Sequence, residues 1–339
     1  MVLLVTGVAG FIGTNFVYYY LNKYPDRKIV GIDKLTYAGD VENFMLLKPD
    51  QKSRFTFILG DITDKTFISS LFDKNDITGI INFAAESHVD RSIQGAELFI
   101  HSNVFGVFSL IETIRKKLWV QNEWPENFKF IQISTDEVYG SLTADQKFTE
   151  QTPVHPNNPY SASKASGDLF VQSFCNTYGF PGMISRCSNN YGPFQHPEKL
   201  IPLIIQRALN HQEIPVYGDG EQIRDWLYVT DHCAAIDSIY EKGLKNNVYN
   251  IGGENVRTNI DLINHILAIL QEITGDRNIN TTLITHVPDR LGHDRRYAID
   301  PMKIMTQLKW RPETQFEIGM RSTILWYLHH QDWVKNRRC

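Results

Sequence analysis

The sequence predicts an α/β protein with a doubly wound parallel sheet and a smaller mixed α/β domain toward the C-terminus. Three observations support this prediction. Short apolar runs recur along the first half of the chain, amphipathic stretches separate them, and from about residue 189 Pro, Gly and polar loops take over. Apolar runs without alternation are typical of strands buried on both faces, and their exchange with helical patterns indicates βα repeats.

The expected elements follow one another through the chain. Six apolar runs are expected to form parallel strands: 2–7, 28–33, 55–62, 79–85, 128–135 and 182–188. Helical patterns cover residues 11–24 and 104–118. Each helix would carry the chain back between two parallel strands, as a doubly wound sheet requires.

The division into domains follows from the change near residue 189. We expect residues 1–188 to form the first domain, with 229–253, a helix and a strand, returning to it. Residues 189–228 and 254–339 would form the second domain from shorter elements, and the last five residues, KNRRC, a frayed and solvated tail.

Composition and charge narrow the class of protein. The chain has 339 residues, of which 42% are hydrophobic, and a formal net charge of -4, so no basic surplus indicates a nucleic-acid or membrane partner. No His or Cys spacing predicts a metal site. The four cysteines lie far apart, which favours inert thiols in a reducing compartment, and no signal-type or membrane-spanning run is present. We expect a cytoplasmic protein.

A glycine pattern follows the first strand. Gly7, Gly10 and Gly13 lie between that strand and an amphipathic helix, where helix N–H groups favour a pyrophosphate. Asp33 ends the second strand, where a carboxylate accepts hydrogen bonds from the adenosine ribose and repels a 2′-phosphate. The pattern predicts a Rossmann-type site for NAD in preference to NADP. The alternatives are a ligand-free glycine turn and a simple turn aspartate.

Two groups of residues indicate chemistry. Thr135, Asp136 and Glu137 close the strand 128–135, and the adjacent acids are either solvated loop charges or a proton donor and acceptor. Tyr160 and Lys164 have the i, i+4 spacing of one helix face. A buried lysine beside a tyrosine would lower the tyrosine pKa toward a usable range, so Tyr160 could take a proton from a sugar hydroxyl.

Together these residues resemble the extended short-chain dehydrogenase/reductase superfamily, which works on nucleotide sugars. Within it, the dTDP-glucose 4,6-dehydratases are similar to the segments ISTDEVYG, FAAESHVDRS, SRCSNNYGPFQHPEKLIP, DGEQIRDWLYVTDH, VYNIGG and DRLGHDRRYAID. The similarity runs from residue 1 to about residue 330. One departure is GVAG, with Val8 where relatives commonly have glycine.

The resemblance implies a lyase with tightly bound NAD that oxidises C4 of a nucleotide-linked glucose, eliminates water across C5 and C6, and returns the hydride to C6. The product would be dTDP-4-dehydro-6-deoxy-glucose. Glu137 would remove the C5 proton and Asp136 would protonate the departing O6. Tyr160 would deprotonate O4, Thr135 would hydrogen-bond O4, and Lys164 would hold the tyrosine and the nicotinamide ribose.

The resemblance also implies the binding residues and the assembly. Further cofactor-binding residues would be Phe11, Ile12, Lys34, Thr36, Asp61, Ile62, Ala84, Ala85, Ser87, Ser102 and Asn190. Substrate-binding residues would be His88, Asn189, Lys199, Leu200, Pro215, Tyr217, Arg224, Asn259, Arg290 and His293. The helix 104–118 and the helix after Tyr160 would pair across a two-fold axis in a homodimer.

Several alternatives stay open at this point. A UDP-glucose 4,6-dehydratase differs from the dTDP enzyme by a methyl and a 2′-hydroxyl in the substrate, and one methyl gives only ~1–3 kcal/mol of discrimination. A nucleotide-sugar 4-epimerase or decarboxylase could use the same fold, although the acid pair argues against epimerisation. A generic alcohol dehydrogenase would accumulate NADH, and a catalytically silent NAD-binding protein would hold the cofactor without turnover.

Overall fold

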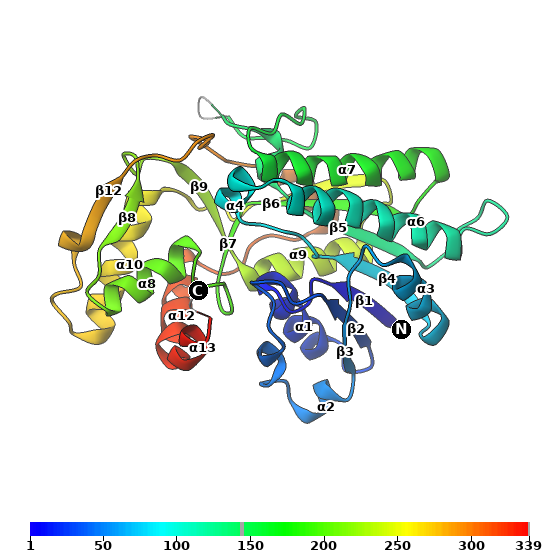
Figure 1. Ribbon diagram of the computed structural model, residues 1–339, viewed down its shortest axis with the longest axis horizontal. Helices are drawn as coiled ribbons and strands as arrows, with labels where there is room; N and C mark the ends of the chain where they lie inside the picture. Colours follow the sequence, from blue (N-terminus) through cyan, green and yellow to red (C-terminus); the bar gives the residue numbers. More distant parts are fainter. Residues whose placement is uncertain (143–145, 338–339) are drawn as a thin grey trace.

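The computed structural model describes residues 1–142 and 146–337 and is built around one parallel sheet of seven strands (Figure 1). The strand order is β10-β6-β5-β4-β1-β2-β3. The strands are β1 (Val2–Thr6), β2 (Lys28–Asp33), β3 (Phe55–Leu59), β4 (Ile77–Asn82), β5 (Lys129–Thr135), β6 (Gly182–Cys187) and β10 (Asn247–Ile251). The chain winds in opposite directions from β1, so the predicted α/β doubly wound fold is confirmed.

Helices cover both faces of this sheet because its strands are apolar on both sides. One face packs against α1 (Phe11–Lys23), α9 (Val229–Lys242) and α11 (Met302–Leu308). The other face packs against α3 (Lys65–Lys74), α6 (Gly106–Leu118) and α7 (Pro159–Tyr178). Figure 1 shows α6 and α7 above the sheet and α1 below it. Two hydrophobic cores therefore fix the strand ends that carry the site.

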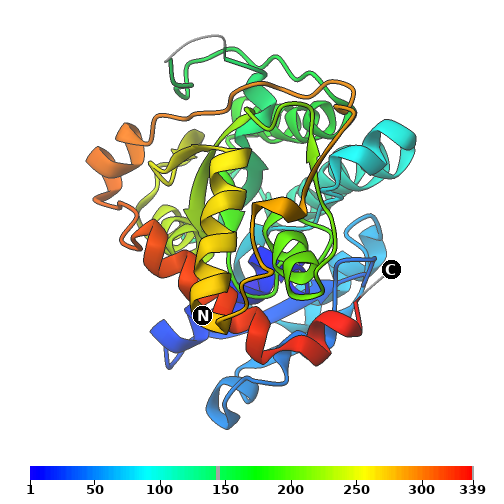
Figure 2. The same ribbon diagram turned by 90° about the vertical axis from the view of Figure 1, so that its left-hand side faces the viewer.

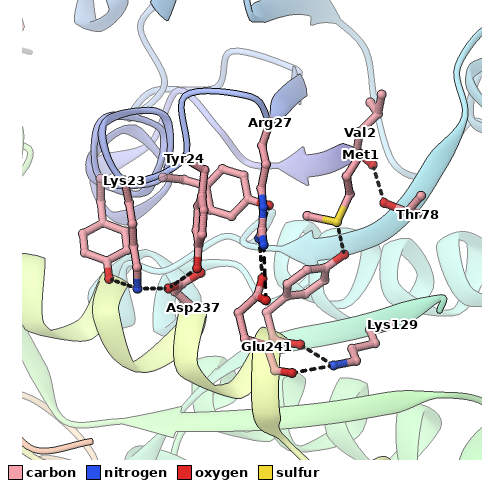
Figure 3. A network of polar contacts seen from close by, with 12 residues as sticks. Met1, Val2, Lys23, Tyr24, Arg27, Thr78, Lys129, Asp237 and Glu241 are labelled. Carbon is pink, nitrogen blue, oxygen red and sulfur yellow. Dashed lines mark hydrogen bonds and ion pairs between the residues drawn. The ribbon is translucent and has the colours of Figure 1, made fainter.

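Polar contacts hold helix α9 against the last residue of α1 and the residues that follow it (Figure 3). Lys23 Nζ lies 2.5 Å from Asp237 Oδ2, and the Tyr24 hydroxyl donates to the same oxygen at 3.1 Å. Arg27 forms an ion pair with Glu241. Strand β10 then pairs with β6. Residues 229–251 thus pack onto the sheet built from the first 188 residues.

The second half of the chain has its own core beside the sheet (Figure 2). Its helices are α8 (Leu200–Leu209), α10 (Asn259–Thr274), α12 (Phe316–His329) and α13 (Gln331–Lys335). Its strands are β7 (Asn189–Tyr191), β8 (Ile214–Tyr217), β9 (Ile223–Tyr228), β11 (Val256–Thr258) and β12 (Ile284–Val287). The expectation of shorter elements holds for β7, β8, β11 and β12 and is wrong for β9, α10 and α12. Helix α10 has 16 residues and buries a full apolar face.

Short helical turns complete the fold, and one of them, η3, carries Asp136 and Glu137. They are η1 (Val41–Phe44), α2 (Pro49–Lys52), α4 (Val89–Gln94), α5 (Glu97–Phe99), η2 (Ile100–Phe105), η3 (Asp136–Tyr139) and η4 (Thr281–Leu283). The helix predicted over 104–118 corresponds to α6, and the π-helical turn η2 leads directly into it. Within residues 1–142 and 146–337, no helix combines the length and apolarity needed to cross a membrane.

Two expectations about side chains have different outcomes. Cys175, Cys187 and Cys233 are buried free thiols, as predicted, whereas Cys339 lies outside the described residues. The expected solvated tail is wrong for Arg337, whose side chain is 7% exposed and packs with its guanidinium carbon 4.0 Å from the centre of the Trp333 ring. Packing and an ion pair with Asp40 outweigh solvation there.

Candidate active site

A cavity of about 320 Å³ lies at the carboxyl ends of the parallel strands, where open α/β sheets bind ligands. It contains the point between β1 and β4 at which the winding direction reverses. The residues predicted to bind cofactor all line it: Gly7, Gly10, Phe11, Ile12, Gly13, Asp33, Lys34, Thr36, Asp61, Ile62, Ala84, Ala85, Ser87, Ser102, Tyr160, Lys164 and Asn190. The same wall includes Thr135, Asp136 and Glu137.

The glycine turn leaves no room for a side chain at Gly7 or at Gly13. Gly7 has φ +63°, and a Cβ there would lie 2.5 Å from the Ala84 nitrogen. A Cβ on Gly13 would lie 2.4 Å from the Gly7 carbonyl oxygen. Val8, the departure from the common pattern, is fully buried against Gly31 and leaves the turn intact. Helix α1 begins here with no side-chain cap, so its N–H groups are available to an anion.

Asp33 is held at the end of β2 by backbone donors. Its Oδ2 accepts from the Ala9 nitrogen at 2.9 Å, and its Oδ1 accepts from the Leu35 nitrogen at 2.8 Å. Burial raises the pKa of Asp33, and these hydrogen bonds oppose the rise. Nearby, Lys34 Nζ donates to Ser102 Oγ at 2.9 Å. A fixed carboxylate beside a glycine turn and a free helix N-terminus fits a dinucleotide that ends in an adenosine ribose.

The acid pair lies in η3, one turn that begins where β5 ends. Thr135 caps this turn: its Oγ1 accepts from the Glu137 nitrogen at 3.3 Å and donates to Asp136 Oδ1 at 3.3 Å. Asp136 is 2% exposed, and its Oδ2 has no hydrogen-bond partner among the described residues. The alternative of two solvated loop charges therefore does not apply to Asp136. A buried oxygen without a partner is available to a ligand.

The two carboxyl groups have different surroundings. Burial raises the pKa of Asp136 well above its ordinary value, and the charge of Glu137 raises it further. Burial also raises the pKa of Glu137, but the charges of Arg224 and Arg290 oppose that rise. When one proton is shared between the pair, it is held by Asp136, and Glu137 is the ionised partner.

Tyr160 and Lys164 lie on the first turns of α7. Asn158 caps this helix by accepting from the Ser161 nitrogen at 2.9 Å, and Pro159 starts it. Burial and then the charge of Glu137 raise the pKa of Tyr160 well above its ordinary value. The expected lowering by Lys164 is thus wrong for this structure. Lys164 Nζ instead donates to the Ile133 carbonyl at 2.7 Å.

The predicted substrate residues divide between two places. Asn189 and Lys199 line the cavity, and Lys199 Nζ donates to the Ser87 carbonyl at 3.1 Å. The remaining ones lie outside the cavity wall, as far as the described residues define it: His88, Leu200, Pro215, Tyr217, Arg224, Asn259, Arg290 and His293.

Several members of this outer group cluster around β8 and β9. The Tyr217 and His293 ring centres are 6.3 Å apart, and His293 hydrogen-bonds Asp289 at 2.6 Å. Arg224 is 5% exposed and donates to the Asp294 carbonyl at 2.9 Å. Asn259 Oδ1 is buried without a hydrogen-bond partner among the described residues.

Sequence reasoning missed other residues of the cavity wall. They include Tyr37, Glu86, Ser134, Cys187, Gln195 and His196. Arg91 packs over the Tyr37 ring with its guanidinium carbon 3.8 Å from the ring centre. Burial raises the pKa of Glu86. Glu86 was already within the FAAES segment at the end of β4, so its position at a strand end was a usable signal.

The fold and this site define an extended short-chain dehydrogenase/reductase: a doubly wound sheet, a glycine turn, a strand-end aspartate and a Tyr-x-x-x-Lys pair. Comparison with known proteins is more specific. The chain matches the family described as GDP-mannose 4,6 dehydratase over residues 4–323. It is 46% identical over 336 residues to the dTDP-glucose 4,6-dehydratase of Xanthomonas campestris pv. campestris, covering 98% of this chain and 94% of that protein. It therefore belongs to the nucleotide-sugar 4,6-dehydratase family.

Solved structures agree with this membership. The dTDP-glucose 4,6-dehydratase of Bacillus anthracis in complex with NAD has a TM-score of 0.88 and 42% identity, with 100% of both chains covered. The Streptomyces venezuelae enzyme with NAD and TYD bound has a TM-score of 0.89 and 39% identity, again covering 100% of both. A UDP-glucose 4-epimerase of Thermotoga maritima has a TM-score of 0.85 at 28% identity and covers 98% of this chain and 100% of its own.

Proposed function

We propose that this chain is an NAD-dependent dTDP-glucose 4,6-dehydratase that forms dTDP-4-dehydro-6-deoxy-glucose and water. One observation carries the proposal: a buried Asp136 and an adjacent, half-buried Glu137 lie in the same cavity wall as Tyr160 and Lys164. Oxidation at C4, with NAD as the hydride acceptor, needs only the tyrosine and lysine among these four side chains. An acid next to a base is needed when water must also leave from C5 and C6.

The cofactor half of the site is supplied by residues of the first sheet. The turn at Gly7, Gly10 and Gly13 takes the pyrophosphate, and Asp33 accepts the adenosine ribose hydroxyls. NAD bound there would supply the acceptor for the hydride that leaves C4 and the donor of the hydride that reaches C6. Because the hydride removed from C4 returns to C6 of the same sugar, the two redox steps cancel and the net reaction is a dehydration.

The oxidation begins when Tyr160, in its ionised form, takes the proton of the C4 hydroxyl. Thr135 hydrogen-bonds the same oxygen, and Lys164 lies one helical turn away on the same face of α7. The resulting ketone at C4 makes the C5 proton acidic because the carbanion is delocalised into it. This step therefore prepares the elimination.

The elimination uses the two acids in opposite roles. Glu137, the ionised partner, removes the C5 proton while Asp136 donates its proton to O6, the C6–O6 bond breaks and water leaves. Glu137 then returns a proton to C5 as hydride reaches C6. Tyr160 and Asp136 regain their starting states by proton exchange with solvent.

The nucleotide half of the site follows from cations in the second half of the chain. Lys199, Arg224 and Arg290 contact the diphosphate, for which arginine offers paired donors. Support for the dTDP base comes from the relatives named above and from the TYD-bound structure among them. We assign cofactor binding to residues 1–188 with 229–253, and nucleotide-sugar binding to 189–228 with 254–339.

A homodimer is also proposed. Large apolar side chains on the α6 and α7 side of the molecule are exposed, among them Phe105 (43%), Leu169 (54%) and Phe170 (37%). The Phe108 and Phe170 ring centres lie 5.7 Å apart, so the patch joins both helices. A contiguous apolar patch marks an interface. We further propose a cytoplasmic location, since the three described cysteines are free thiols.

The test is a comparison of three substrates with no added cofactor. Purified protein is incubated with dTDP-glucose, UDP-glucose and CDP-glucose, and products are analysed by mass spectrometry. Loss of one water, fastest from dTDP-glucose, supports the proposal. An unchanged mass with a galactose-configured product would indicate an epimerase, and an unchanged substrate in every case would indicate a silent binding protein.

A further inference from the structure

Asn43 joins the glycine turn to the end of the described chain. It is 2% exposed, and its Nδ2 donates to the Ala9 carbonyl at 3.0 Å and to Thr14 Oγ1 at 3.2 Å. Its own carbonyl accepts from the Tyr18 hydroxyl at 2.6 Å. Asn43 is therefore fixed against the turn and against α1.

The other side of the same amide is held by the C-terminal segment. Trp333 Nε1 donates to Asn43 Oδ1 at 2.8 Å, and Arg337 Nη2 donates to it at 3.3 Å. Arg337 also forms an ion pair with Asp40, whose backbone nitrogen donates to the Ala9 carbonyl at 3.2 Å. Figure 2 shows the C-terminal helices, in red, beside blue segments of the N-terminal part.

Aromatic packing anchors this segment to the rest of the molecule. The Trp333 ring centre lies 5.0 Å from that of Trp326 and 6.1 Å from that of Phe194. Phe194 in turn stacks on Tyr18 of α1 at 5.7 Å with an interplanar angle of 9°. Packing against Trp326 and Phe194 thus holds the Trp333 ring in the position from which it donates to the Asn43 side chain.

The contacts surround a loop of the cofactor cavity. Lys34, Thr36, Tyr37, Ala38 and Gly39 line the cavity together with the glycine turn. At one end this loop is fixed by Asp33, and at the other end by Asp40 and Asn43. A molecule that fills this part of the cavity lies between the loop and the glycine turn, so it contacts both segments.

We propose that Trp333 and Arg337 are positioning residues that keep the loop 34–40 closed and thereby slow the release of NAD. The inference rests on the proposed cofactor site. Slow release of NAD suits the proposed reaction, because the hydride taken from C4 returns to C6 and the cofactor has no need to leave between turnovers. The segment acts on retention of the cofactor and not on the chemical steps.

The experiment measures cofactor release from three single variants. Trp333→Phe removes the N–H donor and keeps most of the packing, and Arg337→Met removes the charge and keeps the length of the side chain. Lys335→Met is the matched control, because this lysine is on the same helix and its side chain is 63% exposed. Release of bound NAD is followed by exchange against an excess of isotopically labelled NAD, with thermal unfolding measured in parallel.

We expect Trp333→Phe and Arg337→Met each to release NAD about five- to tenfold faster than wild type, as the loss of one buried hydrogen bond or ion pair implies. The maximal rate with saturating NAD stays within about twofold of wild type for these variants. Lys335→Met is expected to match wild type in every readout.

Wild-type release rates in both variants would overturn the inference, even if their unfolding temperatures fall, because the segment would then only stabilise the fold. An equal acceleration in Lys335→Met would overturn it as well. If wild-type protein carries no NAD and binds none, the proposed cofactor site itself is wrong, and this inference fails with it.

Discussion

Replacement of Asp168 by asparagine should strongly destabilise the protein. Arg186 Nε lies 3.0 Å from Asp168 Oδ2, and the two side chains are 2% and 0% exposed. The same oxygen accepts from Ser134 Oγ at 3.0 Å, directly before Thr135. Asp168→Asn keeps the shape and removes the charge, which leaves Arg186 buried without a counter-charge.

The expected cost follows from that burial. Breaking a buried ion pair by changing one partner costs about 3–5 kcal/mol. With an unfolding entropy of about 2.1 cal/mol/K per residue over 339 residues, the unfolding temperature should fall by about 4–7 °C. Burial raises the pKa of Asp168, and the charge of Arg186 opposes that rise, in agreement with a pair whose desolvation is costly.

Thermal unfolding by calorimetry at equal NAD content tests this value. Asp73→Asn is the matched control, because it breaks an exposed pair with Lys117 and should cost at most about 1 kcal/mol. The double variant Asp168→Asn/Arg186→Met should be more stable than Asp168→Asn, since no uncompensated charge stays buried. A single variant that unfolds within about 1 °C of wild type, or a double variant no more stable than the single, would refute the reasoning.

Three other changes separate the roles of the site. Glu137→Gln should still form NADH when substrate is added, but its rate of water loss should be about 10²-fold or more below that of wild type. Tyr160→Phe should form no NADH, and stopped-flow absorbance distinguishes the two variants. Equal loss of both steps in Glu137→Gln would contradict the assignment. The pKa of Asp136 is raised in the folded protein, so the stability that this group contributes is complete in acid. That stability is lost as the pH rises above about 4, by up to about 1.4 kcal/mol per pH unit. Asp136→Asn should therefore gain stability relative to wild type between acid and neutral pH, as measured by denaturant titrations. Gly7→Ala should lower NAD affinity by tenfold or more in calorimetry, because its Cβ would lie 2.5 Å from the Ala84 backbone nitrogen; unchanged affinity would mean that the turn does not hold the pyrophosphate.

The sequence predicted the sheet well because each strand carries its own apolar run. Residues 28–33 have the expected bounds. Runs 55–62 and 79–85 end earlier than expected, at Leu59 and Asn82, which are the last residues paired with β2 and β1. Their remaining residues line the cavity. A local pattern cannot distinguish a residue that is apolar for the sheet core from one that is apolar for a cavity wall.

The candidate site was predictable for residues that directly follow or end a predicted strand. Gly7, Asp33 and the acids after β5 all lie at strand ends, and the structure brings them to one cavity. The high pKa of Tyr160 was not predictable, since it depends on burial and on Glu137 from another element. The contact of Arg337 with Asp40 leaves no local signal, because it joins opposite ends of the chain.

The central claim is that one bound NAD oxidises and reduces the same sugar within a turnover. The most direct measurement uses dTDP-glucose with deuterium at C4, turned over without added NAD in ordinary water, with the product examined by NMR. The account predicts that the deuterium moves from C4 to C6 of a product that has lost one water. Deuterium that remains at C4, or that is lost to solvent or to free NADH, would contradict it.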